Sequence, residues 1–241
     1  MRKKIHTVHT QILGNDAPFA FVEAYKTLRT NLQFASINND YKKIIVTSSL
    51  PGEGKSTVAI NLALSLQSDG NRVLLVEADL RKPAIQRYLH LGSVGSAGLS
   101  NILTKREKLQ QALILLSDSE LSVILAGPVP PNPAEMLGSR NMKELIDTLE
   151  KDYDYIVFDT PPVSVVTDAA VLSKWCDGVL LVVKQKFTDK QSVLLAKDNL
   201  VKVGANIIGC VMTDFKPSQS KHSYTYYNYK YQYGYDSHNE K

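Results

Sequence analysis

The amino-acid sequence predicts an α/β fold: an open, mostly parallel sheet with helices on both faces. Short apolar, β-branched runs recur along the 241 residues, and each run is nearly continuous in apolar character rather than alternating. Such runs are typical of strands that helices cover on both sides. Segments with helical periodicity separate the runs, and this alternation predicts right-handed crossovers between parallel strands.

Six strands are predicted in chain order, at residues 43–49, 72–78, 121–127, 154–160, 178–184 and 206–212. Between them, residues 56–67 form a predicted helix followed by Gly70, and residues 188–203 form another that ends at Gly204. A further helix is predicted to begin at Asn132, because Pro133 suits the first helical position and Glu135 completes a capping box.

Two segments lie outside this alternation. Residues 19–34 form a predicted amphipathic helix, with Phe21, Ala24, Leu28 and Leu32 along one side. After Lys216 the sequence becomes polar, low in complexity and rich in tyrosine, which predicts a disordered tail. We therefore expect an N-terminal arm at 1–17, one domain at 18–215 and a tail at 216–241, since a chain of this length and 44% apolar content can bury one sizeable core.

The composition narrows the class of partner and the compartment. The net charge of +4, from 28 Lys and Arg against 24 Asp and Glu, is too small to indicate nucleic-acid binding. Cys176 and Cys210 lie in or beside apolar runs, which predicts packed thiols in a reducing cytoplasm. The longest apolar runs are far shorter than a membrane span, and no apolar stretch follows the charges of residues 1–11, so neither a transmembrane helix nor a signal peptide is expected.

The segment IIVTSSLPGEGKST carries the strongest chemical signal, because a predicted strand runs into a glycine-rich turn and then a helix. Gly52 and Gly54 allow backbone N–H groups to surround an anion, and the helix N-terminus adds its positive dipole end. Lys55 then suits the β- and γ-phosphates of ATP, and the Ser56 hydroxyl suits Mg²⁺. This is the pattern of a P-loop, with Ser49 in place of the usual first glycine.

The P-loop pattern predicts a set of nucleotide-binding residues: Ser49, Pro51, Gly52, Glu53, Gly54, Lys55, Ser56 and Thr57. A glycine-containing loop that carries GKST by chance is the alternative. The placement between strand and helix argues against it.

Acidic residues follow two other predicted strands, where Mg²⁺ bound to phosphates usually finds a carboxylate. Asp159 follows the run YIVF, as a Walker B aspartate does. Glu77 and Asp79 end the second strand, and their i, i+2 spacing places them on one face if the strand stays extended, so that both can point at one metal or hydroxyl. We therefore predict a metal site at Ser56, Asp79 and Asp159, and catalytic roles for Lys55, Glu77, Asp79, Arg81 and Asp159. Alternatively, Asp79 caps the following turn and Arg81 lies on a solvated face.

The motifs PGEGKST, LLVEADLRKP and IVFDTPP, followed by a tyrosine cluster, resemble those of the bacterial tyrosine kinases that control capsule and exopolysaccharide synthesis. The segment GPVPPNPAEML is also similar to one in that family. The resemblance implies that Ser49 to Thr57, Glu77 to Arg81 and Asp159 bind Mg-ATP. The family usually has Asp where Glu77 stands, so Asp79 is the preferred base.

The same resemblance implies that Glu23, Lys26 and Arg29 join neighbouring subunits into a ring, with Lys26 in place of the usual Arg. Their spacing by three places them on one helix face. From the residues alone, the alternative is a solvated face. Lysine lacks the bidentate fork of arginine, so we expect an altered ring stability.

Seven of the 12 tyrosines lie within twelve positions of the tail: Tyr224, Tyr226, Tyr227, Tyr229, Tyr231, Tyr233 and Tyr235. An aromatic surface for bases or sugars is one alternative, although the tail has few lysines. A flexible tail can also reach an active site, and each phosphate adds nearly two negative charges. We therefore predict phosphorylation of these tyrosines in trans within a ring, which the accumulated charge then loosens.

Two other functions stay open at this point. One is a partition or positioning ATPase, although such proteins carry a lysine early in the P-loop, where this chain has Pro51. The other is a regulatory module that binds ATP without efficient transfer.

The resemblance implies a membrane-spanning activator, attachment through it to the inner face of the plasma membrane, and a dedicated tyrosine phosphatase. Base recognition stays open, because Thr213 and Asp214 stand where related ATPases often have Asn.

Overall fold

The computed structural model describes residues 12–14, 16–37, 39–92, 97–117 and 119–216. The predicted disordered tail and most of the predicted N-terminal arm therefore lie outside the described residues. Within the described part, no helix is long and apolar enough to cross a membrane.

A seven-stranded sheet in the order β3-β4-β2-β5-β1-β6-β7 forms the centre of the described chain. All six predicted strands are present and pair in parallel. They are β1 (Lys43–Ser48), β2 (Val73–Glu77), β4 (Ser122–Ile124), β5 (Tyr155–Asp159), β6 (Gly178–Lys184) and β7 (Ile207–Thr213). The predicted α/β class and the mostly parallel sheet are confirmed.

The prediction missed β3 (Leu113–Leu115), which pairs antiparallel with β4 at the sheet edge. Its residues belong to the apolar run Ala112 to Leu116, but that run is short and begins at the end of α5 (Leu109–Ala112), and periodicity alone does not distinguish such a run from part of a helix.

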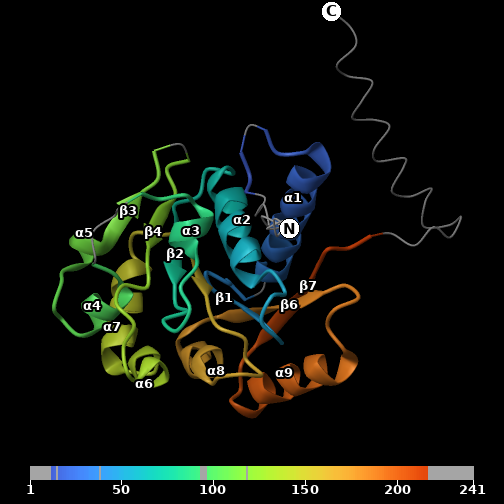
Figure 1. Ribbon diagram of the computed structural model, residues 1–241. Coiled ribbons are helices and arrows are strands. Elements are labelled where there is room, and N and C mark those ends of the chain that lie inside the picture. Colours follow the sequence, from blue (N-terminus) through green and yellow to red (C-terminus); the bar gives the residue numbers. More distant parts are fainter. Residues whose placement is uncertain (1–11, 15, 38, 93–96, 118, 217–241) are drawn as a thin grey trace, which may run out of the picture.

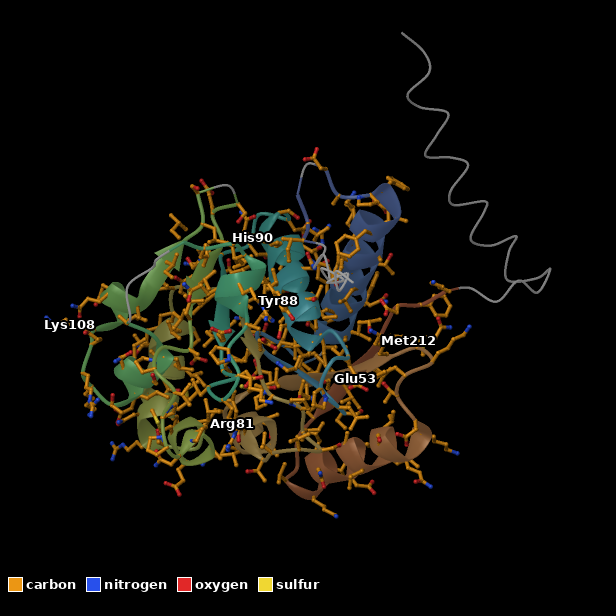
Figure 2. All side chains as sticks on the ribbon, in the orientation of Figure 1. Glu53, Arg81, Tyr88, His90, Lys108 and Met212 are labelled. Carbon is orange, nitrogen blue, oxygen red and sulfur yellow. The ribbon has the colours of Figure 1, made fainter. Side chains whose placement is uncertain are left out.

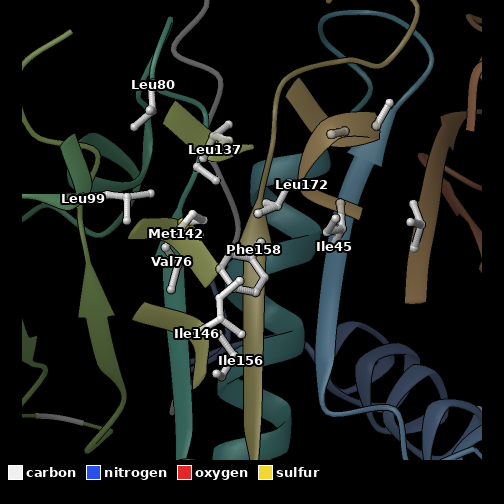
Figure 3. Close-up of a cluster of buried hydrophobic side chains, with 14 of the residues drawn as sticks. Ile45, Val76, Leu80, Leu99, Leu137, Met142, Ile146, Ile156, Phe158 and Leu172 are labelled. Atoms are coloured by element: carbon white, nitrogen blue, oxygen red, sulfur yellow. The ribbon is translucent and has the colours of Figure 1, made fainter. Parts of the chain in front are cut away.

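Helices cover both faces of the sheet (Figure 1). In β1, Ile45 contributes to one apolar cluster, with α4, α6, α7, α8 and α9, whereas Ile44 and Val46 contribute to the other, with α1, α2 and α3. Figure 3 shows part of the first cluster, where Phe158 of β5 packs near Met142 of α7. This division follows from the alternation of side chains along an extended strand.

The helices of the described residues vary widely in length, and several span a single turn. They are α1 (Phe19–Ser36), α2 (Lys55–Gln67), α3 (Ile85–Tyr88), α4 (Leu99–Leu103), α5 (Leu109–Ala112), α6 (Pro133–Leu137), α7 (Arg140–Leu149), α8 (Asp168–Leu172) and α9 (Lys190–Lys202), with a 3₁₀ turn at Ser173–Trp175.

Three local expectations need correction. In α1, Ala24 is exposed and Tyr25 is buried with Leu32, because the buried stripe is set by contact with α2. Asn132 precedes α6, but its amide donates to the Glu135 carboxylate at 2.7 Å, so no capping box forms. Cys210 is exposed, since β7 is an edge strand.

Candidate nucleotide site

The strand order brings the predicted site residues to one edge of the sheet. Because β5 lies between β1 and β2, the carboxyl ends of these three strands are neighbours. Asp159 ends β5 and is aligned with Val46 of β1 on one side and Glu77 of β2 on the other. The P-loop, which follows β1, therefore opens beside both acidic strand ends, at the edge where open α/β sheets bind ligands.

The turn between β1 and α2 has the backbone that its glycines predict. Gly52 and Gly54 have φ values of 85° and 90°, in the left-handed region that favours glycine. A Cβ on Gly54 would also lie 3.3 Å from Cγ2 of Thr213, at the end of β7. The backbone conformation at position 54 thus favours glycine, and a side chain there would also crowd Thr213.

Lys55 contacts Asp159, at the end of β5, and Asp79, two residues beyond the end of β2. Its Nζ lies 2.9 Å from Oδ2 of Asp79 and 3.3 Å from Oδ1 of Asp159, and it donates to Ser56 Oγ at 3.2 Å. Burial lowers the pKa of Lys55, but the charges of Asp159 and Asp79 outweigh it, so its pKa is raised. The predicted cation, hydroxyl and two carboxylates therefore converge on one point.

Asp159 is fully buried, and its Oδ2 has no hydrogen-bond partner among the described residues. Burial raises the pKa of this carboxyl, Asp79 adds to the rise, and Lys55 and Ser56 oppose it. A buried carboxylate with one oxygen left without a partner is costly unless a cation or a donor lies near that oxygen.

Asp79 caps a turn with one carboxylate oxygen and faces Lys55 with the other. Its Oδ1 accepts the backbone N–H of Lys82 at 3.0 Å, which caps the turn, while Oδ2 faces Lys55. The side chain is almost buried, so this carboxylate is held in place toward the P-loop.

Glu77 does not share the face of Asp79, and the expectation that both point at one metal is not met. Its Oε1 accepts N–H groups of Ala84 and Ile85, at the start of α3, and its Oε2 accepts that of Ala126 at 3.1 Å. β2 ends at Glu77, so the chain from Glu77 to Asp79 is not an extended strand. The i, i+2 spacing therefore does not place the carboxylates of Glu77 and Asp79 on one face. Glu77 ties α3 and the segment after β4 to β2.

Arg81 is exposed, as the alternative expected, but it is paired, and its partner is Asp168 rather than a residue of the P-loop. Its Nε and Nη2 atoms donate to the Asp168 carboxylate at 3.0 and 2.9 Å, a bidentate pair whose acidic side chain is completely buried. The hydrogen bond to Asp168 raises the pKa of Arg81. Arg81 thus joins the segment after β2 to the first turn of α8.

Glu53 points away from the space that the P-loop encloses. Its carboxylate accepts the backbone N–H of Leu50 at 2.8 Å and the hydroxyl of Thr188, and its backbone carbonyl accepts the Thr213 hydroxyl at 2.7 Å. Glu53 is buried and labelled in Figure 2. The side chain therefore braces the loop against the segment before α9 and against β7.

The remaining P-loop residues differ in exposure. Ser49 is buried and its Oγ has no partner among the described residues, whereas Pro51 is exposed. Thr57 is half-buried, and its carbonyl accepts the Asn61 amide at 2.9 Å.

The residues predicted to join subunits make contacts within the chain. Lys26 pairs with Glu23 at 2.8 Å on the surface of α1. Arg29 turns toward α2, where it donates to the Ser65 carbonyl at 2.7 Å and lies 3.2 Å from Asp69. Figure 1 shows α1 alongside α2. A role of these residues in joining subunits stays a prediction.

The site fits a nucleotide and its cation. The glycine turn, the unpartnered Asp159 oxygen and the clustered Lys55, Ser56 and Asp79 match the donors and acceptors that a magnesium-bound triphosphate needs. Within the described chain no three His, Cys, Asp or Glu gather as a metal cluster, and Mg²⁺ at phosphates is usually held by one or two carboxylates.

Fold and site together define a P-loop nucleotide-binding protein. Residues 41–203 match the family model described as AAA domain. The chain is 42% identical to the tyrosine-protein kinase YwqD of Bacillus subtilis (strain 168) over 201 residues, which covers 83% of each chain. It therefore belongs to the bacterial tyrosine-protein kinases.

Solved structures agree with this family. The chimerical protein CapA2B2 superimposes with a TM-score of 0.78 at 34% identity, covering 86% of this chain and 91% of that one. The kinase domain of the Escherichia coli tyrosine kinase ETK also has a TM-score of 0.78, at 30% identity, covering 91% and 88%. The septum site-determining protein MinD of Pyrococcus horikoshii, complexed with Mg-ADP, shares the fold alone, with a TM-score of 0.61 and 24% identity over 76% of this chain and 73% of that one.

Sequence reasoning missed the residues that hold the site from a distance. Asp168, Thr188 and Ala126 lie 87, 135 and 49 positions from their partners. No local pattern in the sequence links Asp168 to Arg81, because only the folded chain brings the two residues together. The tyrosines of the predicted tail lie outside the described residues.

Proposed function

We propose that this chain transfers the γ-phosphoryl group of ATP, with Mg²⁺, to tyrosines of its own tail in trans, and thereby regulates capsule or exopolysaccharide synthesis. The observation that carries the proposal is the convergence of Lys55, Ser56, Asp79 and Asp159 at the P-loop, in a chain whose sequence also holds seven clustered tyrosines. Family membership supports the choice of tyrosine as acceptor.

Each residue at the P-loop has a role in this proposal. Magnesium-bound ATP, when present, supplies the phosphoryl group and an electrophilic phosphorus. Ser56 and Asp159 hold the cation, and Lys55 neutralises charge on the phosphates. Lys55 leaves Oδ2 of Asp79 when it turns toward them, so that Oδ2 becomes free to accept the phenol proton of the acceptor tyrosine. Arg81 and Glu77 position the segments that carry Asp79.

The partners follow from the same proposal. We expect a membrane-spanning activator that attaches the kinase to the inner face of the plasma membrane, and a cognate phosphatase that resets the tail. Subunits assemble in a ring through Glu23, Lys26 and Arg29. Phosphates on the tail then loosen the ring by repulsion between like charges.

Purified full-length protein with labelled ATP tests the proposal directly. Wild type should label tyrosines between Tyr224 and Tyr235, located by mass spectrometry, and Lys55→Met should abolish the label. Activity should rise when the membrane activator is added. Label absent from tyrosine in wild type with its activator, or equal label after Lys55→Met, would overturn the proposal.

The same experiment separates the two other functions. A partition-type ATPase would hydrolyse ATP and change its oligomeric state without labelling tyrosine. A regulatory module would bind ATP with neither hydrolysis nor label.

A further inference from the structure

A cleft separate from the P-loop opens between α3 and the segment that follows β4. It has a volume of about 720 Å³, within the range of small-ligand sites. Glu77 lies at its wall with Leu125, Ala126 and Gly127, and Gln86, Arg87 and His90 come from α3 and the residue positions just after it. Figure 2 labels Tyr88 and His90 at this end of the molecule, apart from Glu53 in the P-loop.

The walls of the cleft combine apolar surface with cationic or hydrogen-bonding groups. Pro83, Leu91, Leu125 and Pro128 supply apolar surface. Arg87 is exposed, its guanidinium lies 5.0 Å from the centroid of the Tyr88 ring, and it forms no ion pair with any described residue. Stacking on a ring leaves the N–H edges of a guanidinium available to an anion.

Glu77 is the acidic residue among those that line the cleft, and both of its carboxylate oxygens already have donors. Both carboxylate oxygens of Glu77 accept backbone N–H groups, and burial raises its pKa while those hydrogen bonds oppose the rise. Glu77 is 1% exposed. Arg87 is therefore the charged group that remains available to a ligand in the cleft. The His90 imidazole and the Gln86 amide line the same cleft.

We propose that this cleft binds a phosphotyrosine of the kinase's tail, with the ring on the apolar wall and the phosphate at Arg87 and His90. The inference rests on the proposed function, because that reaction makes the phosphotyrosine. A phosphate dianion pairs with arginine in bidentate geometry, and a flat phenyl ring suits walls of Pro and Leu. Beyond Lys216, the unmodified tail carries Lys221, Lys230 and Lys241 against Asp236 and Glu240, so its side chains have no net negative charge to attract Arg87 before phosphorylation.

The strand order sets the distance between the cleft and the P-loop, and a short extended segment of the tail can span it. The cleft borders the ends of β2 and β4, and β4 is three strands from β1. At about 4.8 Å per strand this is about 14 Å, which about four extended residues span. Tyrosines four apart recur in the tail, at Tyr227 and Tyr231, Tyr229 and Tyr233, and Tyr231 and Tyr235. A phosphotyrosine held in the cleft thus presents a second tyrosine to the P-loop.

The tail is long enough to reach this cleft from its own subunit or a neighbour. The described chain ends just after β7, five strands from β4, or about 24 Å along the sheet. From Lys216 to Tyr231 the chain can extend about 50 Å. The first phosphate should therefore promote the next, and phosphorylation of one tail should be processive.

Binding of a synthetic peptide to the full-length protein tests the site without catalysis. The peptide has the sequence of residues 222–236 with a fluorophore, prepared with phosphotyrosine at position 231 or with tyrosine there. Binding is measured by anisotropy, without nucleotide, on protein treated with a phosphatase that is removed beforehand. We expect the phosphorylated peptide to bind at least about tenfold more tightly, because charge-assisted hydrogen bonds to Arg87 add to ring contacts.

Variants at exposed positions locate the site. Arg87→Gln and His90→Gln should each weaken binding of the phosphorylated peptide, Arg87→Gln by about tenfold. The matched control is Arg140→Gln on α7, which removes the same charge from a side chain that is 89% exposed and outside the cleft. Equal unfolding midpoints in urea show that the variants are folded.

Three results would overturn the assignment: equal binding of the two peptides, an equal loss in Arg140→Gln, or equally tight binding when phosphoserine replaces the phosphotyrosine. A kinase assay adds an independent readout. Arg87→Gln should retain the initial rate of the first phosphorylation but accumulate singly phosphorylated tails. If no variant and no wild type labels tyrosine, the proposed function fails, whereas the peptide measurement still decides the cleft.

Discussion

Replacing Glu77 tests whether this residue holds the fold together or holds a metal. The side chain is 1% exposed, and its carboxylate accepts three backbone N–H groups, from Ala84, Ile85 and Ala126. Glu77→Ala leaves all three without that acceptor. Each unsatisfied buried donor costs about 1–3 kcal/mol, so we expect Glu77→Ala to lower the free energy of unfolding by about 3–9 kcal/mol.

Glu77→Gln is the milder, nearly isosteric variant. Its amide oxygen can still accept from Ala84 and Ile85, but its NH₂ group then faces the N–H of Ala126, so one hydrogen bond is lost. The expected cost is about 1–3 kcal/mol. Urea unfolding at 25 °C, followed by circular dichroism, measures both variants against wild type.

The magnesium dependence of nucleotide binding separates the two roles. If Glu77 is structural, Glu77→Gln binds magnesium-bound ATP with the wild-type dependence on Mg²⁺, whereas Asp79→Asn, at the P-loop, alters that dependence. Glu77→Gln with unchanged unfolding but a raised Mg²⁺ requirement would refute the reasoning and restore the contact with a metal that the i, i+2 spacing of Glu77 and Asp79 allows.

Three further predictions concern single contacts. Gly54→Ala should abolish nucleotide binding in calorimetry while the chain stays folded, because position 54 has φ 90° and a Cβ there would press on Thr213; wild-type affinity would contradict this. Asp168→Asn should cost about 1–3 kcal/mol in urea unfolding, since it weakens the buried partner of Arg81; an unchanged midpoint would argue against the pair. Burial, opposed by a hydrogen bond from Asn61, raises the pKa of Tyr25 from 10.0 to about 12. The native state therefore holds this proton more tightly, so stability is complete below pH 10 and declines as pH rises toward about 12. Tyr25→Phe should lack this decline when unfolding is measured at pH 8 and pH 11, and parallel pH profiles of the two proteins would disprove the assignment.

Local patterns in the sequence were sufficient for the sheet and the P-loop. Continuous apolar runs predicted all six parallel strands, since helices cover both faces and leave no alternation. β3 was missed although Ala112 to Leu116 are all apolar, because so short an apolar run can belong to a helix or to a strand. Gly52, Gly54 and Lys55 were identified within one contiguous segment, because backbone geometry and phosphate chemistry are both encoded there.

The sequence by itself determined the P-loop turn from Ser49 to Thr57, because strand, turn and helix N-terminus follow one another along the chain. The tertiary structure alone decided where Glu77, Glu53 and Arg81 point. Glu77 ends β2, so the period-two rule that aligned it with Asp79 no longer applies beyond it. Its partners, and those of Arg81 and Glu53, come from segments that only packing of the sheet and helices brings together.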